Sequence, residues 1–310
     1  MSGLSCYTAN VAGYLRRLSP DADRLVARSI RLAIADQDGG LLAFSHHAWP
    51  LNALPWGGAL GYRAATGRDA ALEGVAAELA ATGAVLVVAD GARLPWAPAG
   101  APPAPHFVLL DGRAAGCWHA VDEFSALGPG GLQHEPFTGW IPDSALLRMI
   151  EPGPPPRPEQ RLRNRLAFGA PLPLPPDRTF QWLGVGVQTA RPLPAGWTVD
   201  PAAALDMLAQ RLAAAIGDDR LLDDVWAATQ HHVHRYEVVE PQLGARAAAA
   251  ADAWRALPRT LRFAAISARR GRPRASLVEA ALAGLREIEA QLREPLRALG
   301  FGAEAEVNIR

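Results

Sequence analysis

Lysine is missing from this 310-residue chain, and only two cysteines occur. Arginine carries the positive charge in balance with the acidic residues, so the formal net charge is zero. We attribute the missing lysine to a coding bias, because alanine, glycine, proline and arginine are abundant. A neutral chain gives no electrostatic support for binding nucleic acid or a membrane surface. Cys6 and Cys117 are too few for a disulfide framework, and we expect both thiols to be free.

Long hydrophobic runs are also missing. No apolar stretch reaches the ~18 residues that a membrane-spanning helix needs. The first residues, MSGLSCYTAN, lack the basic start and the apolar run of a secretory signal. We therefore expect a cytoplasmic protein with no membrane partner. With 49% hydrophobic residues, the chain can bury a sizeable core in one large domain or two smaller ones.

Hydrophobic periodicity predicts an α+β first half. We expect helices over residues 8–17, 21–35 and 69–81, and strands over 84–90, from His106 to 110 and from Cys117 to 124. Asp111 and Gly112 are a strong turn signal between the last two strands. The proline-rich run PGPPPRP that follows Ile150 is typical of a stiff linker.

The second half has a helical pattern after one strand, expected over residues 180–190. Asp200 and Pro201 are a helix-start pair, and their helix should run to about residue 216. A further helical tract starts at residue 221, is interrupted at Pro241 and resumes over about 245–257. The last helix is expected from 277 to about 300 with a bend at Pro295, and Ser276 and Glu279 stand in capping-box spacing at its start. The predicted organisation is a domain over 1–150, a linker over 151–178 and a mostly helical domain over 179–310.

Cys6 is the candidate nucleophile. It stands beside the N-terminus of the first predicted helix, where unpaired backbone N–H groups and the helix dipole favour a thiolate. The hairpin offers the base: with the turn centred between Asp111 and Cys117, residues whose numbers add to 228 face each other. His106 then pairs with Asp122 on one face, the arrangement in which a carboxylate orients an imidazole. The same parity places His119 on the other face.

Four segments carry a resemblance to a known family: Cys6 in SCYTAN, the run VLVVADGARLPW, PHFVLLDG and WHAVDEF. They resemble the butirosin biosynthesis protein H family, whose N-terminal half has the papain-like fold of bacteriocin-processing cysteine peptidases. The resemblance covers residues 1–150, and the helical remainder suits the C-terminal domain of that family. It implies that Cys6 is the nucleophile, His106 the base and Asp122 the orienting acid.

The resemblance also implies a reaction. In such proteins an acyl group, held on an acyl carrier protein as a phosphopantetheine thioester, is moved to an amine during antibiotic assembly. We therefore expect a cysteine acyltransferase that needs no metal and no cofactor of its own. A cysteine hydrolase, either peptidase or thioesterase, would use the same triad with water as the acceptor. A non-catalytic binding or scaffold protein with this fold is the third possibility.

The oxyanion donors are left open by the sequence. The related peptidases place a glutamine shortly before the nucleophile, where this chain has none. The backbone N–H of Cys6 or Tyr7 is a candidate, because first-turn amides point toward negative charge. Asn52 and Gln133 are candidate side-chain donors.

The helical domain is expected to bind the acceptor and to keep water from the acyl-enzyme. Its candidate residues are Trp226, Tyr236, Glu237 and Glu240, where the two acids would attract a cationic amine. The arginines of residues 269–274 are expected to be a solvated loop, or else a docking site for an acidic carrier protein. Of the histidines at 231, 232 and 234, only His231 and His234 have the i, i+3 spacing of metal ligands on a helix, and no cysteine or carboxylate completes a recognisable set, so we expect no metal site there.

Overall fold

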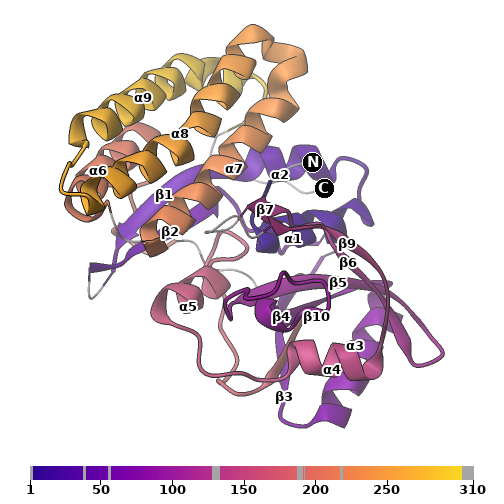
Figure 1. Ribbon diagram of the computed structural model, residues 1–310. Helices are drawn as coiled ribbons and strands as arrows, with labels where there is room; N and C mark the ends of the chain where they lie inside the picture. Colours follow the sequence, from indigo (N-terminus) through magenta and orange to yellow (C-terminus); the bar gives the residue numbers. More distant parts are fainter. Residues whose placement is uncertain are drawn as a thin grey trace. The chain divides into compact units, whose positions relative to one another are not determined.

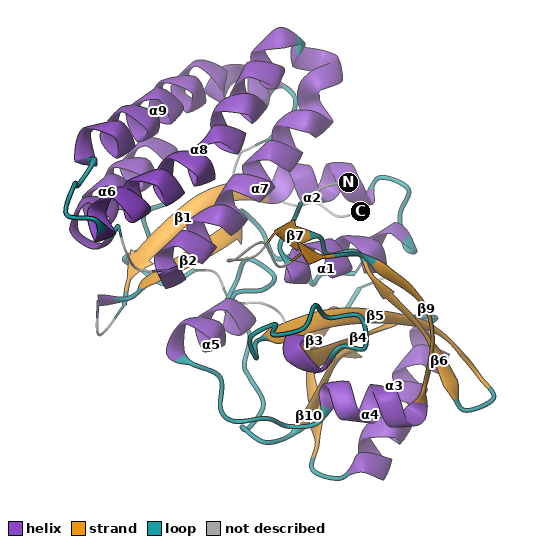
Figure 2. Cartoon of the chain, in the orientation of Figure 1, coloured by secondary structure: helices purple, strands orange, loops and turns teal. Residues whose placement is uncertain are grey.

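The structure is a computed structural model that describes residues 3–37, 40–54, 57–127, 133–186, 191, 193–216 and 219–301. It is a mixed α+β protein, as predicted, with a six-stranded sheet formed mainly by the first half of the chain and helices in the second (Figures 1 and 2). The chain forms two compact units. Unit 1 comprises Met1–Ala22 and Pro50–Pro192, and unit 2 comprises Asp23–Trp49 and Leu193–Arg310.

Unit 1 is organised around a six-stranded antiparallel sheet with the order β3-β10-β4-β5-β6-β9. Its strands are β3 (Ala59–Ala65), β4 (Val85–Asp90), β5 (Pro105–Ala114), β6 (Cys117–Asp122), β9 (Phe137–Pro142) and β10 (Phe180–Gly186). A separate two-stranded pair joins β7 (Ala126–Leu127) to β8 (Gln133–His134). The β-branched and aliphatic run of β4 suits its position between two neighbours, where both faces are covered.

Helices cover this sheet. α3 (Arg68–Thr82) and α4 (Asp143–Ile150) pack against it, and their apolar side chains share one core cluster with residues of β4, β5, β6 and β10. α1 (Cys6–Arg16) contacts β4, β5 and β6, and Tyr7 packs edge-on against Phe107 with ring centroids 4.7 Å apart. The unit also contains α5 (Pro158–Arg165) and the short 3-10 helix Gly91–Arg93.

Unit 2 is mostly helical. Helices α6 (Pro201–Ala215), α7 (Asp219–Leu243), α8 (Ala245–Arg269) and α9 (Ala275–Ala298) pack side by side (Figure 1). The unit also holds nearly all of α2 (Ala22–Ser29) and the strand pair β1 (Ile30–Asp36) and β2 (Leu42–His47), whose apolar side chains join the helical core. Among the described residues, no helix is long and apolar enough to cross a membrane.

The predicted domain boundaries need correction. β10 follows the proline-rich run, yet it pairs with both β3 and β4 inside the sheet of unit 1. The predicted linker over 151–178 contains α5 and the buried side chains of Leu166 and Phe168, so it belongs to unit 1. Residues 23–49, assigned to the first domain, belong to unit 2. Strand pairing between segments far apart in the sequence decides the boundary between the two units, and the composition of the chain does not predict that boundary.

Most of the predicted elements are confirmed with small shifts at their ends. The helix expected over 21–35 is half wrong, because α2 stops at Ser29 and residues 30–36 form β1. The strand expected over 180–190 is confirmed to Gly186, and residues 187–190 lie outside the described residues. Asp200 caps α6 as predicted, its carboxylate accepting from the Ala203 amide. The Ser276 capping box is absent, since α9 begins at Ala275 and has no side-chain cap. Pro241 lies inside α7 and does not break it.

Candidate active site

Cys6 is the first residue of α1. The helix begins there because the Ser5 side chain accepts a hydrogen bond from the Thr8 amide at 3.4 Å, which satisfies one of the unpaired first-turn donors. The Cys6 side chain is half-buried. The Cys6 thiol therefore lies at the N-terminal end of α1, beside the first-turn amides.

The hairpin that holds the predicted base turns later than expected. Its two turn residues are Ala115 and Gly116, both with positive φ angles, at 49° and 73°. Two consecutive residues of positive φ suit the twist of a two-residue hairpin. Asp111 and Gly112 instead lie within β5, so the predicted turn and its pairing register are wrong.

An irregularity in β5 changes the pairing register within the hairpin and so keeps His106 and Asp122 on the same face of the sheet. Gly112 faces His119, so the residue numbers of this pair add to 231, whereas Leu110 faces Ala120 and those numbers add to 230. Asp111 is thus an extra residue, a β-bulge. Without it, the sum of 231 would put His106 and Asp122 on opposite faces. With it, both lie on one face in diagonal positions, which side chains of this length can bridge.

His106 and Asp122 form the predicted contact. His106 Nε2 lies 2.9 Å from Asp122 Oδ2, and both side chains are buried. Cys6 lies close enough to the same imidazole to raise the pKa of His106. Because Nε2 is engaged by the carboxylate, Nδ1 is the ring nitrogen left for the thiol. The three candidates from the sequence are thus brought together.

Asn10 joins the helix to the hairpin. Its side-chain amide donates to Asp122 Oδ1 at 3.0 Å and to the Phe107 carbonyl at 2.7 Å, and its carbonyl accepts from the Glu123 amide at 3.1 Å. Asn10 lies one turn after Cys6 on α1. These bonds therefore hold the nucleophile's helix in register with the base and the acid.

The surroundings shift the pKa values of His106 and Asp122 in opposite directions. Burial alone would lower the pKa of His106, but the adjoining Cys6 sulfur and the Asp122 carboxylate outweigh it and raise that pKa to about 10. Burial alone would raise the pKa of Asp122, but hydrogen bonds from His106 and His134 hold it well below the usual range. At neutral pH the site therefore holds an imidazolium beside a carboxylate.

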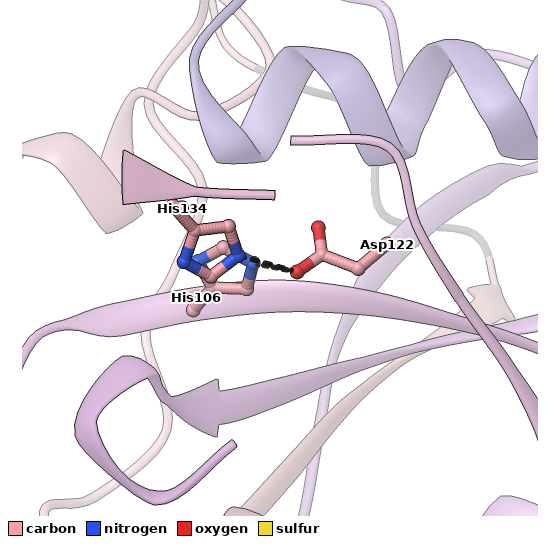
Figure 3. Close-up of side chains that lie close together, drawn as sticks. All are labelled: His106, Asp122 and His134. Carbon is pink, nitrogen blue, oxygen red and sulfur yellow. Dashed lines mark hydrogen bonds and ion pairs between the residues drawn. The ribbon is translucent and has the colours of Figure 1, made fainter. Parts of the chain in front are cut away.

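A second histidine, which the sequence reasoning missed, completes the site. His134 Nε2 lies 3.0 Å from Asp122 Oδ2, so both imidazoles point at the same oxygen (Figure 3). The glycine-rich run GPGGL before Gln133 is a turn signal that could have placed a second hairpin, and His134 with it, close to Asp122.

These three side chains are also a possible metal set, since their ligand atoms lie within 4.8 Å of one another. Hydrogen bonds account for the arrangement without a metal. Trp96 Nε1, which can only donate, lies 2.9 Å from the same Asp122 Oδ2. The carboxylate therefore sits among donors, as an anion would.

The oxyanion candidates differ in what they can offer. Cys6 and Tyr7 lie in the first turn of α1, whose amides point out of the helix end. The Asn52 side chain is buried and donates to the Leu60 carbonyl, so it serves a structural bond rather than an open site. The Gln133 side chain is exposed on β8.

Of the acceptor candidates, Tyr236 is in the wrong place. Its side chain is fully buried in unit 2, and its hydroxyl donates to Glu289 Oε1 at 2.7 Å. Arg235 and Trp254 donate to the same buried carboxylate, so this group belongs to the core.

The other three acceptor candidates are accessible to different degrees. Trp226 is half-buried, Glu240 is exposed, and Glu237 is exposed and pairs with Arg255. The histidines at 231 and 232 are buried against rings, stacked on His46 and Trp254.

No protein-family model matches the chain, and a search of curated proteins found no match.

Proposed function

We propose that the chain is a papain-like cysteine acyltransferase that moves an acyl group from a carrier-protein thioester through Cys6 to an amine. The observation that carries the proposal is the buried His106–Asp122 pair, with Cys6 close enough to raise the pKa of the imidazole. A nucleophile within reach of a base, which is itself oriented by a third group, is the signature of covalent catalysis. The carrier donor and the amine acceptor come from the family resemblance.

The first half-reaction uses the protonated state of His106. The Cys6 thiolate attacks the thioester carbonyl, and the resulting oxyanion faces the first-turn amides of Cys6 and Tyr7. The carrier thiolate leaves and takes the proton of the His106 imidazolium. The products are the Cys6 acyl-enzyme, a free carrier thiol and a neutral imidazole.

The second half-reaction uses that neutral imidazole as a base. Once Cys6 is acylated, its charge is gone and no longer favours the protonated ring. The acceptor amine attacks the acyl-enzyme carbonyl while His106 takes the amine proton. Collapse of the intermediate expels the Cys6 thiolate, which restores the starting ion pair and releases an amide. Neither half-reaction needs ATP, a metal or a redox cofactor.

Intact-protein mass spectrometry tests the nucleophile. Incubation with a pantetheine thioester, or with an acyl carrier protein that bears the same acyl group, should add one acyl group per chain. Cys6→Ala should abolish the adduct and Cys117→Ala should retain it. Cys117 is the matched control, because it is a half-buried thiol at the start of β6. An adduct on Cys117 would contradict the assignment.

The fate of the adduct separates the remaining possibilities. Addition of a primary amine should release the acyl group as an amide faster than water releases it as free acid. Release of free acid alone would assign the chain to the hydrolases. If the wild-type chain takes up no acyl group from any thioester, a non-catalytic role replaces the proposal.

A further inference from the structure

Asp122 receives more hydrogen bonds than a simple catalytic triad supplies. Its Oδ2 atom lies 2.9 Å from His106 Nε2, 2.9 Å from Trp96 Nε1 and 3.0 Å from His134 Nε2. Its Oδ1 atom accepts from Asn10 and from the Phe124 amide. A carboxylate offers roughly four lone-pair sites, and here five donors converge on it. His106 therefore shares Oδ2 with two other N–H groups.

His134 comes to this carboxylate from a separate strand. It ends β8, which pairs only with β7 among the described strands, through Ala126 facing His134 and Leu127 facing Gln133. The His134 side chain is 12% exposed, so its imidazole is largely removed from water. Its bond to Asp122 ties this small strand pair to the end of β6.

Ring packing fixes the second imidazole beside the first. The His134 ring lies 5.2 Å from the His106 ring and 5.0 Å from the Phe124 ring, between centroids, and Phe124 in turn lies 5.4 Å from His106. Three rings thus surround the point at which both imidazoles meet the carboxylate. A side chain so constrained has few alternative rotamers, so its N–H stays aimed at Oδ2.

We propose that His134 is a positioning residue for the Cys6–His106 pair. Its bond to Asp122 fixes the carboxylate and the β7–β8 pair beside His106, and it weakens the hydrogen bond between that carboxylate and the His106 N–H. The inference rests on the proposed function, since it assigns a role within the same site. His134 acts through Asp122 and touches no reacting atom.

The direction of its influence follows from competition. Each N–H donor on Oδ2 withdraws part of the electron density that would otherwise bind the His106 proton. The other titratable groups around this proton are Cys6 on α1 and, beside Cys6, Tyr62 on β3. Removing the His134 donor leaves these in place, so the pKa of His106 should rise above its value of about 10.

Two substitutions separate the hydrogen bond from the packing. His134→Gln keeps an N–H donor at about the position of Nε2, and His134→Leu keeps bulk but has no donor. The measurement is the single-turnover rate of Cys6 acylation by a pantetheine thioester, followed by mass spectrometry from pH 6 to pH 11 in the Cys117→Ala chain. Thermal unfolding of each variant reports whether the fold is kept.

His134→Leu should slow acylation about tenfold at neutral pH, the effect of one hydrogen bond to a charged group, and should move the high-pH decline to higher pH. His134→Gln should restore both the rate and the profile. The control is the same pair of substitutions at His119, which also bonds a carboxylate, Asp111, at 2.5 Å but from the other face of β6. Both control variants should match the parent chain.

Three results would overturn the inference: an unchanged profile in His134→Leu, equal damage from Leu and Gln at position 134, or the same damage at position 119. Equal damage would mean that the ring only packs. These outcomes are separate from a failure of the proposed function, which would appear as no Cys6 acylation in the parent chain. In that case the alkylation rate of Cys6 by iodoacetamide, over the same pH range and variants, tests the positioning role by itself.

Discussion

Asp122→Asn is the sharpest test of the site. The change removes the negative charge and turns one of the two carboxylate oxygens into an N–H donor. In one orientation the new amide nitrogen faces the three donors at Oδ2, namely His106, His134 and Trp96. In the flipped orientation it faces the two donors at Oδ1, Asn10 and the Phe124 amide. In the flipped orientation the Asn10 amide keeps the Cys6 and Phe107 carbonyls as acceptors, so the Phe124 amide is the donor that loses its acceptor.

The magnitude follows from this count. A buried donor left without its acceptor costs about 1–3 kcal/mol, so the better orientation predicts a loss of about 1–3 kcal/mol in the free energy of unfolding. Domains of this size are stable by roughly 5–15 kcal/mol, so we expect a weakened chain that still folds at room temperature. Turnover should fall by about 10³–10⁴, or ~4–5.5 kcal/mol in the barrier, because the amide no longer favours the productive tautomer and charge of His106.

Urea unfolding followed by circular dichroism gives the first quantity, and single-turnover acylation of Cys6 gives the second. His119→Ala is the control, because the His119 side chain is 28% exposed and its bond to Asp111 lies away from the site. It should cost less than about 1 kcal/mol in stability and leave acylation within a few-fold of the wild type. Equal losses in the two variants would refute the reasoning, since the carboxylate at position 122 would then have no special relation to His106.

Three further outcomes are expected. Burial lowers the pKa of His231 to about 3 and that of His47 well below 6.5. Below pH ~6.5 the unfolded chain therefore binds more protons than the folded chain, and the melting temperature should fall from there toward pH 3. A melting temperature that does not change over this range would contradict the prediction. Glu289→Gln should lower the free energy of unfolding by about 3–5 kcal/mol, because the buried Arg235 guanidinium loses its counter-charge. Urea denaturation measures this loss, and an unchanged free energy of unfolding would contradict the prediction. A chelator should leave acylation unchanged, whereas loss of activity restored by Zn²⁺ would identify the side chains of Figure 3 as metal ligands.

Local signals explain the parts of the fold that the sequence predicted well. Asp200 caps the helix that follows it, and the run from Val85 to Asp90 forms a buried strand, as its β-branched composition indicates. Each of these depends on residues within one turn or one strand. Such elements form where neighbouring side chains and backbone groups satisfy one another, so a short window of sequence contains the information.

Non-local pairing decided the elements that the sequence misplaced. Residues 30–36 have an apolar pattern compatible with a helix or a strand, and pairing with β2 makes them β1. β10 lies in the sheet between β3 and β4, more than a hundred residues from the one and about ninety from the other. A chain cut near Ile150 would therefore lose an inner strand of unit 1, so truncation there is no test of a separate catalytic domain.

The candidate site divides in the same way. The sequence by itself determined that Cys6 lies beside the start of a helix and that His106 and Asp122 lie on neighbouring strands of a hairpin, because helix starts and hairpins are local. Only the tertiary structure decided that these strands meet with a bulge at Asp111, which puts both side chains on one face, and that His134 reaches the same carboxylate oxygen. A single added residue in a strand moves every side chain beyond it to the other face of the sheet. A buried carboxylate accepts hydrogen bonds from donors that tertiary packing places near it. Neither the bulge nor the set of donors follows from a local sequence pattern.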